Sequence, residues 1–266
     1  MHKLARHVRF SITPFLADER RGYNSYASEP PGEGLSIFFD LCVELAGPVD
    51  AETGFVVNVL DIDEKVREFV VPIFAASIKE DFRRGRHTPL AAIAELLRLA
   101  WARLAGRFGL AKVNRLSLAL NPYRKITVES EVSKMLYYSE KFEFAAMHRL
   151  WNESFSDEHN RQVFGRCANP AGHGHNYVVE VTVKIPGSET GLRMGDFERI
   201  VDDEFIGLVD HKNLNADVAE LRKINPTVEN IAALAWEKLV GKFGESALQR
   251  VTVWETDKTH CSYCGA

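Results

Sequence analysis

"LAWARLAGRFG" occupies residues 99–109, and "LAWEKLVGKFG" occupies residues 234–244. Seven of the eleven positions are identical, and two more exchange Arg for Lys. Each copy ends an amphipathic stretch and leads into an alternating segment, residues 113–120 in the first case and 248–255 in the second. A helix followed by a strand therefore occurs twice, which predicts two copies of one structural unit.

The match continues on the N-terminal side of each copy. Residues 51–66 match residues 188–203, and the alternating segment 35–45 matches 175–185. We predict two units, residues 1–130 and 131–266, each with two strands, two helices and two more strands.

Within a unit, alternation gives each strand one apolar face, which a helix such as residues 225–243 can cover. The expected fold class is α+β, with each unit a two-layer structure of one sheet and two helices. Edge strands would remain, and pairing with further units is the usual way to cover them.

Composition is that of an ordinary globular protein and excludes several classes of function. The chain has 266 residues, 45% of them hydrophobic, and a formal charge of −4, so neither a nucleic-acid footprint nor a basic membrane patch is expected. The first ten residues lack the apolar core of a signal peptide, and no run approaches the ~20 apolar residues of a membrane helix. A cytoplasmic protein with reduced thiols is expected, and its four cysteines are Cys42, Cys167, Cys261 and Cys264.

The stretch "CANPAGHGHNY", residues 167–177, contains the strongest chemical signal. In an extended segment His173 and His175 point to the same side, because side chains alternate along a strand. The alternating segment 141–148 ends at His148, so three imidazoles can converge if the two strands pair. Three neutral histidines with an open fourth position are the ligand set of a catalytic zinc ion.

Each of these residues also has a simpler interpretation. An isolated His-x-His is more often two hydrogen-bonded histidines at a sheet edge. Asp210 and His211 can form a turn, while Thr227 and Glu229 fit a helix N-terminus as cap and first-turn acid. Cys261 and Cys264 have metal-ligand spacing without a second pair, so they are assigned no role.

Several motifs occur in an order that resembles the 6-pyruvoyl-tetrahydropterin synthase family and its bacterial relative, 6-carboxy-tetrahydropterin synthase. The resemblance runs from about Tyr138 to the C-terminus. It rests on Phe-x-Ala-x-His at 144–148, Cys-x5-His-Gly-His-Asn-Tyr at 167–177, Gly-x4-Asp-Phe at 191–197, Asp-His-Lys-Asn-Leu from Asp210, Pro-Thr-x-Glu-Asn from Pro226 and Glu-Thr at Glu255 and Thr256.

This resemblance implies a fold and an activity. The fold is the T-fold, a four-stranded antiparallel sheet backed by two helices, which assembles through sheet edges into barrels. The substrate is 7,8-dihydroneopterin triphosphate, and Zn²⁺ holds its side-chain hydroxyls. The implied roles are Zn²⁺ ligands for His148, His173 and His175, proton-abstracting base for Cys167, partner relay for Asp210 and His211, pterin anchor for Glu255, and secondary pterin contacts for Thr227, Glu229 and Thr256.

The first copy has none of these groups when the repeats are overlaid. Pro14 lies opposite His148, Glu33 opposite His173 and Leu35 opposite His175. Ala27 lies opposite Cys167. The overlay also places Ile73 and Phe74 opposite Asp210 and His211, and Leu120 opposite Glu255.

A catalytically silent first copy is therefore expected to act as a built-in structural subunit. Because the related barrels place each active site between neighbouring units, a homo-oligomer is expected, a trimer or hexamer of tandem units.

Three functions remain open at this point. The leading one is a zinc-dependent lyase that eliminates triphosphate from 7,8-dihydroneopterin triphosphate to give 6-pyruvoyl-tetrahydropterin. The nearest alternative is 6-carboxy-tetrahydropterin synthase activity, which releases acetaldehyde. The third is a non-catalytic pterin-binding scaffold, against which the presence of Cys167, Asp210 and His211 argues.

Overall fold

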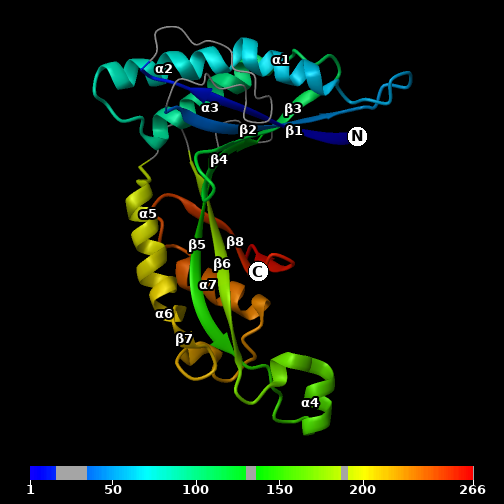
Figure 1. The fold of residues 1–266 in the computed structure, drawn as a ribbon, viewed down its shortest axis with the longest axis vertical. Helices are drawn as coiled ribbons and strands as arrows, with labels where there is room; N and C mark the ends of the chain where they lie inside the picture. The colour runs from blue at the N-terminus through cyan, green and yellow to red at the C-terminus, as the bar shows by residue number, and fades with distance from the viewer. Residues whose placement is uncertain (16–34, 130–135, 187–190, 266) are drawn as a thin grey trace. The chain divides into compact units, whose positions relative to one another are not determined.

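The structure, a computed structural model, describes residues 1–15, 35–129, 136–186 and 191–265. The chain divides into two compact units (Figure 1). Unit 1 comprises Met1–Tyr138 with Pro186–Thr190, and unit 2 comprises Ser139–Ile185 with Gly191–Ala266. Each unit combines an antiparallel sheet with helices, so the α+β prediction is confirmed. No helix in the described part of the chain is long and apolar enough to cross a membrane.

The sheet of unit 1 has the strand order β1-β2-β3-β4, and all neighbouring strands are antiparallel. Side chains alternate between the two faces of each strand, and the apolar ones lie mainly on the face that the helices cover. Phe10 and Leu41 are almost fully buried on this face. Leu35 and Ile37, which alternation also assigns to that face, are instead 84% and 43% exposed. The strands are β1 His2–Ile12, β2 Ile37–Gly47, β3 Lys112–Ala119 and β4 Arg124–Glu129.

The described residues of unit 1 form three helices where the sequence predicts two. The first predicted helix is divided into α1, Val59–Phe69, and α2, Val71–Arg83. Pro72 lies in the first turn of α2, where its missing N–H removes no intrahelical hydrogen bond, so it favours the start of a new helix there. The third helix is α3, Leu90–Leu104, which contains the first half of the quoted repeat.

The sheet of unit 2 has the order β5-β6-β8-β9, with the short strand β7 parallel to β5. Phe144 and Tyr177 are buried on its helix-covered face. Strands β5 and β6 supply the three histidines. The strands are β5 Leu136–His148, β6 His173–Ile185, β7 Lys212–Asn213, β8 Ala247–Thr256 and β9 Thr259–Tyr263.

The main helix of unit 2, α7, is Val228–Leu239, which is shorter at both ends than the predicted 225–243. It begins where the Thr227 side chain accepts a hydrogen bond from the Asn230 backbone N–H, so the predicted cap is confirmed. The other helical segments are α4 Asp157–Phe164, η2 Gly165–Ala168, α5 Met194–Val201, the π-helical turn η3 Asp202–Ile206, α6 Gly207–Val209 and η4 Ala219–Leu221.

Each unit has a register shift between two of its strands, and aligning the two shifts shows which residues of the units correspond. The register shifts after Glu44, which faces Arg115, and after Thr182, which faces Arg250. Aligning these shifts places Leu35 opposite His173 and Ile37 opposite His175, two residues from the overlay made on sequence alone. Glu33 and Ala27, which that overlay used, lie outside the described residues.

Aromatic contacts correct the overlay a second time. Phe10 stacks on Phe39 with ring centroids 5.3 Å apart, as Phe144 stacks on Tyr177 at 4.9 Å. Phe74 meets Phe10 edge-on at 5.7 Å, as Phe205 meets Phe144 at 5.7 Å. Phe74 therefore corresponds to Phe205, five residues before Asp210, and not to His211. The sequence overlay misaligned Phe74 because the helices of the two units differ in length.

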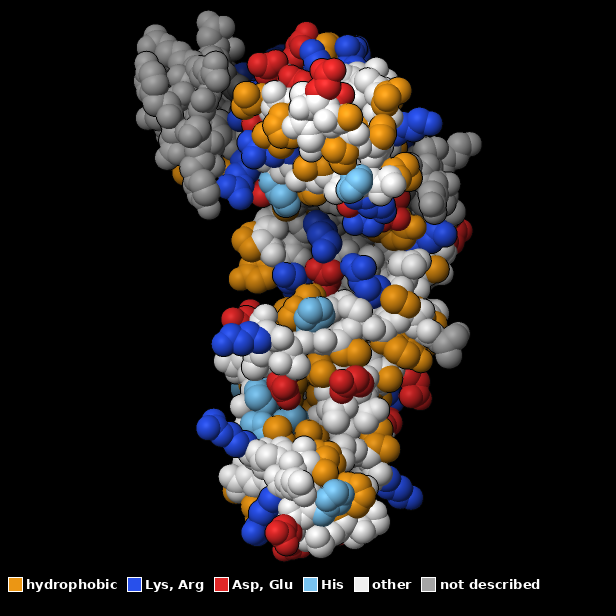
Figure 2. Space-filling view, turned by 90° about the vertical axis from the view of Figure 1, so that its right-hand side faces the viewer, with side chains coloured by type: hydrophobic (Ala, Val, Ile, Leu, Met, Phe, Trp, Pro, Cys, Tyr) orange, Lys and Arg blue, Asp and Glu red, His pale blue; other side chains and the backbone are white. Residues whose placement is uncertain are grey.

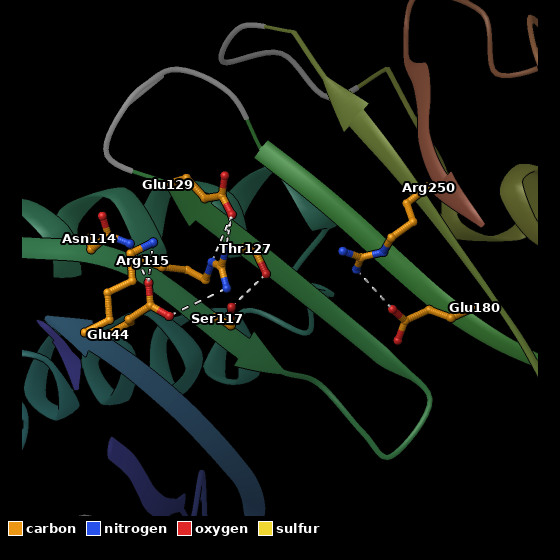
Figure 3. A network of polar contacts seen from close by, with 9 residues as sticks. Glu44, Asn114, Arg115, Ser117, Thr127, Glu129, Glu180 and Arg250 are labelled. Carbon is orange, nitrogen blue, oxygen red and sulfur yellow. Dashed lines mark hydrogen bonds and ion pairs between the residues drawn. The ribbon is translucent and has the colours of Figure 1, made fainter. Parts of the chain in front are cut away.

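The second face of each sheet is polar, and its side chains are paired with one another (Figure 3). In unit 1 Arg115 donates to Glu129 over 2.9 Å, and the Ser117 and Thr127 hydroxyls are 2.8 Å apart. In unit 2 Arg250 donates to Glu180 over 3.5 Å. The apolar core therefore lies between sheet and helices, the side on which the histidines also lie.

Candidate metal centre and active site

Three histidines of unit 2 converge at adjoining ends of two neighbouring strands. His148 is the last residue of β5, and His173 and His175 open β6. Their ligand nitrogens all lie within 4.8 Å of one another, and His148 Nε2 is 3.2 Å from His173 Nε2. Histidine side chains gather beside an acidic side chain on the face of unit 2 that Figure 2 shows. The sequence predicted this convergence, and the structure brings the three rings together.

Gly172 lets the chain approach His148 closely enough for the rings to meet. Its φ is +69°, and a Cβ there would lie 2.9 Å from the His148 carbonyl oxygen. Only glycine adopts this conformation without steric cost. Gly174 has no such constraint, since a Cβ there would be 3.6 Å from Ala146 O.

Two of the three histidines, His148 and His175, are in the neutral state that a metal ligand requires. Burial is the main cause that lowers the pKa of His148 and of His175, so both rings are neutral at pH 7. His175 Nε2 and His173 Nδ1 are buried without a hydrogen-bond partner. Neutral imidazoles with an orphaned buried nitrogen fit a divalent ion such as Zn²⁺, which would satisfy that nitrogen.

Two further groups orient His148, and sequence reasoning missed both. His148 Nδ1 lies 2.7 Å from the Pro226 carbonyl oxygen, and the Tyr177 hydroxyl lies 3.4 Å from the same nitrogen. A hydrogen bond from Nδ1–H to the carbonyl leaves the Nε2 lone pair directed toward the cluster. The motif at Pro226 predicts a helix start and, through the family resemblance, pterin contacts at Thr227 and Glu229. It does not predict the contact with His148, because a backbone carbonyl leaves no residue-type signal.

Cys167, in η2, lies beside the cluster with its Sγ 3.8 Å from His173 Nε2. Burial is the main cause that raises the pKa of its thiol, and the negative charge of Glu255 adds to the effect. Without a cation at the histidines the thiol is therefore protonated at neutral pH. A positive charge at the histidines acts in the opposite direction, toward the thiolate.

Glu255 points at the histidines. One carboxylate oxygen, Oε1, is 3.5 Å from His148 Nε2 and 3.5 Å from His175 Nε2. The family resemblance implies that this carboxylate anchors the pterin. In the structure its neighbours are the imidazoles.

Asp210 and His211 contact one another but not the cluster. His211 Nδ1 is 2.8 Å from Asp210 Oδ2, and the Ala145 backbone N–H donates to Asp210 Oδ1 over 2.8 Å. His211 has a φ of 55°, the only positive value among described residues other than glycine, and its side chain is 82% exposed. Among the described residues neither side chain is hydrogen bonded or ion paired with Cys167 or with the three histidines.

The remaining predicted contact residues have local roles in the structure. Thr227 caps α7, Glu229 lies in its first turn, and the Thr256 hydroxyl accepts a hydrogen bond from the Lys258 backbone N–H. The charge of Glu229 contributes to a raised pKa of Cys261, after burial. Cys261 and Cys264 are free thiols.

A cavity of ≈ 740 Å³ shares His148 with the cluster. Its lining includes Arg149, Arg222 and Lys223 against a single acid, Glu153. The Arg149 Nε is buried without a hydrogen-bond partner, while its guanidinium lies 4.0 Å from the Trp151 ring. Positive charge therefore lies next to the histidines.

Comparison with known proteins agrees with this geometry. The family model of 6-pyruvoyl tetrahydropterin synthase matches residues 137–266. The 6-pyruvoyl tetrahydrobiopterin synthase of Homo sapiens is 37% identical over 130 residues, which are 48% of this chain and 90% of that protein. The Dictyostelium discoideum protein of the same name is 33% identical over 137 residues, 50% of this chain and 99% of that protein.

The solved structure of Caenorhabditis elegans 6-pyruvoyl tetrahydropterin synthase is 31% identical in sequence to this chain, and the two superpose with a TM-score of 0.46. The match covers 50% of this chain and 96% of the Caenorhabditis elegans chain. The residues that the family model matches correspond to unit 2, the unit that carries the histidine cluster. Through that unit, this chain belongs to the 6-pyruvoyl tetrahydropterin synthase family.

Proposed function

We propose that this chain is a zinc-dependent lyase that eliminates triphosphate from 7,8-dihydroneopterin triphosphate and gives 6-pyruvoyl-tetrahydropterin. The observation that carries the proposal is the convergence of His148, His173 and His175 within 4.8 Å, with Cys167 and Glu255 beside them. Relatives of this chain are named 6-pyruvoyl tetrahydrobiopterin synthase. The names support this reaction over 6-carboxy-tetrahydropterin synthase activity.

In this proposal the three histidines hold Zn²⁺, and each remaining group has one task. A bound zinc ion supplies Lewis-acid polarisation of a substrate oxygen, which acidifies the neighbouring C–H bond. The Cys167 thiolate accepts that proton at Sγ. The Glu255 carboxylate accepts two N–H bonds from the amidine edge of the pterin.

Other residues complete the substrate site in the same proposal. Thr227, Glu229 and Thr256 are secondary pterin contacts. The cavity with Arg149, Arg222 and Lys223 offers positive charge for the triphosphate, the group that leaves.

The Asp210–His211 pair suits proton return to the substrate, since His211 Nδ1 is held by the carboxylate and the other ring nitrogen is free to exchange a proton. Because the pair has no contact with Cys167 of its own chain, we place it at Cys167 of a neighbouring copy. This arrangement requires the proposed homo-oligomer of barrel-forming tandem units, in which unit 1 is structural.

The proposal is tested by incubating the zinc-loaded protein with 7,8-dihydroneopterin triphosphate and identifying products by mass spectrometry. Triphosphate with a pyruvoyl product is expected. A carboxy product with acetaldehyde would identify the alternative enzyme, and intact substrate would favour the scaffold.

Cys167→Ala should keep one zinc per chain and lose turnover. Unchanged turnover would refute its role as base.

Mixing tests the placement of the relay. Cys167→Ala and His211→Ala proteins are each expected to be inactive, and co-refolded mixtures should regain a fraction of the activity in mixed oligomers. If both act at one site within a chain, no mixture recovers activity.

A further inference from the structure

The position of Glu255 shows an interaction that pterin anchoring does not explain. Its Oε1 is equidistant, at 3.5 Å, from the Nε2 atoms of His148 and His175. Its side chain is only 20% exposed. A carboxylate oxygen between two imidazole nitrogens is placed to contact any ion that both nitrogens bind.

The distances distinguish a hydrogen bond from a shared coordination sphere. An N–H···O hydrogen bond has a donor–acceptor distance of about 2.7–3.2 Å, so both contacts are too long for one. Two ligands of a tetrahedral zinc ion with bond lengths of 2.0–2.2 Å are about 3.3–3.6 Å apart, because the tetrahedral edge is about 1.63 bond lengths. The contacts from Oε1 match such edges, and the 3.2 Å between His148 Nε2 and His173 Nε2 is close to one. His175 Nε2 has no hydrogen-bond partner.

The backbone at Glu255 independently directs it to the cluster. Trp254 pairs with His260 and Thr256 pairs with Thr259, so the register of β8 with β9 shifts at Glu255. Alternation places Glu255 on the face of Val251 and Val253, and Val253 pairs with Val179, which shares a face of β6 with His175. The carboxylate therefore lies on the histidine side of the sheet, and the register shift releases its backbone from the β9 ladder.

From this geometry we propose that Glu255 is the fourth protein ligand of the metal ion in the substrate-free protein, and that a bound pterin ring draws it away. The proposal rests on the proposed function for its second half, since that function makes the same carboxylate the pterin anchor. Glu255 Oε1 occupies the fourth position beside the three imidazoles until the amidine edge of a pterin takes the carboxylate. The exchange opens the coordination position only when substrate is present. Between turnovers the site is closed, as in a structural zinc site.

The first test measures metal binding without any pterin. Zinc affinity is determined by chelator competition for the full-length protein, Glu255→Gln and Glu255→Asp, with Asp257→Asn as matched control. Asp257 is exposed and loses the same charge two residues away. Loss of a ligand is expected to weaken zinc binding by at least about tenfold in both Glu255 variants, and the control should keep full affinity. Equal affinity in all four proteins would overturn the proposal. Near-UV circular dichroism checks that the variants are folded.

The second test follows the exchange with Co²⁺ in place of zinc, since its visible absorption reports coordination number and ligand type. Addition of a pterin without a side chain should change the spectrum of the Co²⁺ protein and weaken its Co²⁺ affinity. The Co²⁺ spectrum of Glu255→Gln should differ from that of the unaltered protein before pterin is added, and it should change less when pterin is added. A spectrum that pterin leaves unaltered would make Glu255 a permanent ligand and overturn the exchange.

The two proposals fail in different measurements. If Glu255→Gln binds zinc as tightly as the unaltered protein but the unaltered protein releases triphosphate, the lyase proposal stands and the ligand proposal falls. If Glu255→Gln binds zinc more weakly but the unaltered protein forms no product, the ligand proposal stands and the lyase proposal falls.

Discussion

Units 1 and 2 build the same aromatic contact and continue it differently. In unit 1 Phe10 stacks on Phe39, and the positions that correspond to His148 and His175 are Pro14 and the 43% exposed Ile37. In unit 2 Phe144 stacks on Tyr177, and the strands continue to His148 and His175. Core and candidate site thus lie on one face of the sheet, a few residues apart.

This difference separates what folds the unit from what the site requires. The buried rings of unit 1 form without any histidine beyond them, so the histidines of unit 2 are not needed for the sheet and helices to pack. Buried imidazoles without partners destabilise a fold unless something binds them, while the proline and isoleucine at the corresponding positions of unit 1 need no partner. A unit without the histidine cluster is therefore free to carry apolar side chains there.

The largest expected effect compares His173→Ala with Leu35→Ala, the corresponding position of unit 1. Loss of one imidazole should reduce bound zinc from about one per chain to near zero and turnover by at least about a hundredfold. Leu35 is 84% exposed, so its substitution should change stability by less than about 0.5 kcal/mol and leave zinc content unaltered. Metal analysis by mass spectrometry after dialysis decides, and full zinc occupancy in His173→Ala would disprove the ligand assignment.

A second comparison truncates the stacked rings, which are equally buried. Phe10→Ala and Phe144→Ala should each cost about 3–5 kcal/mol of unfolding free energy, because each leaves a cavity in its core. Only Phe144→Ala should also weaken zinc binding, since its strand carries His148. Denaturant titration followed by zinc competition tests both points. An equal loss of zinc affinity in Phe10→Ala would show that the site depends on unit 1.

The third comparison uses two glycines with positive φ. Gly109→Ala in unit 1 meets open space and should cost about 1–2 kcal/mol for the left-handed backbone alone. Gly172→Ala adds a contact of 2.9 Å with the His148 carbonyl, so it should cost more and displace His148. Thermal melting and zinc affinity are the measurements. Equal losses of stability with unaltered zinc affinity in both variants would show that the close contact between Gly172 and His148 is not needed.

The smallest effect concerns two acids whose carboxylates accept backbone N–H bonds. The Thr53 backbone N–H lowers the pKa of Asp50, and the Ala145 backbone N–H lowers that of Asp210. Both folded pKa values lie below the unfolded value of about 3.9, so the stabilisation is complete above that pH and is lost as pH falls through the folded pKa. Asp50→Asn and Asp210→Asn should flatten the acid side of the stability profile. NMR titration of either carboxyl at its ordinary pKa would contradict this.

Sequence patterns predicted the local features of unit 2 well. Alternation placed His173 and His175 on one side of a strand, and the cap at Thr227 followed from residue type. The divided helix of unit 1 was missed, because two consecutive helices have the same apolar periodicity as one. The pairing of Phe74 with Phe205 was also missed, because helix lengths differ between the units.

The chain by itself determined which side chains share a strand face, since adjacent residues alternate whatever the fold. Only the tertiary structure decided that Glu255 reaches His148 and His175, that Pro226 supplies a carbonyl 78 residues from its imidazole, and that Asp210 and His211 lie apart from Cys167. These contacts depend on strand register and on loop closure. A shift of one residue in register turns every side chain of a strand to the opposite face, and no local pattern encodes that choice.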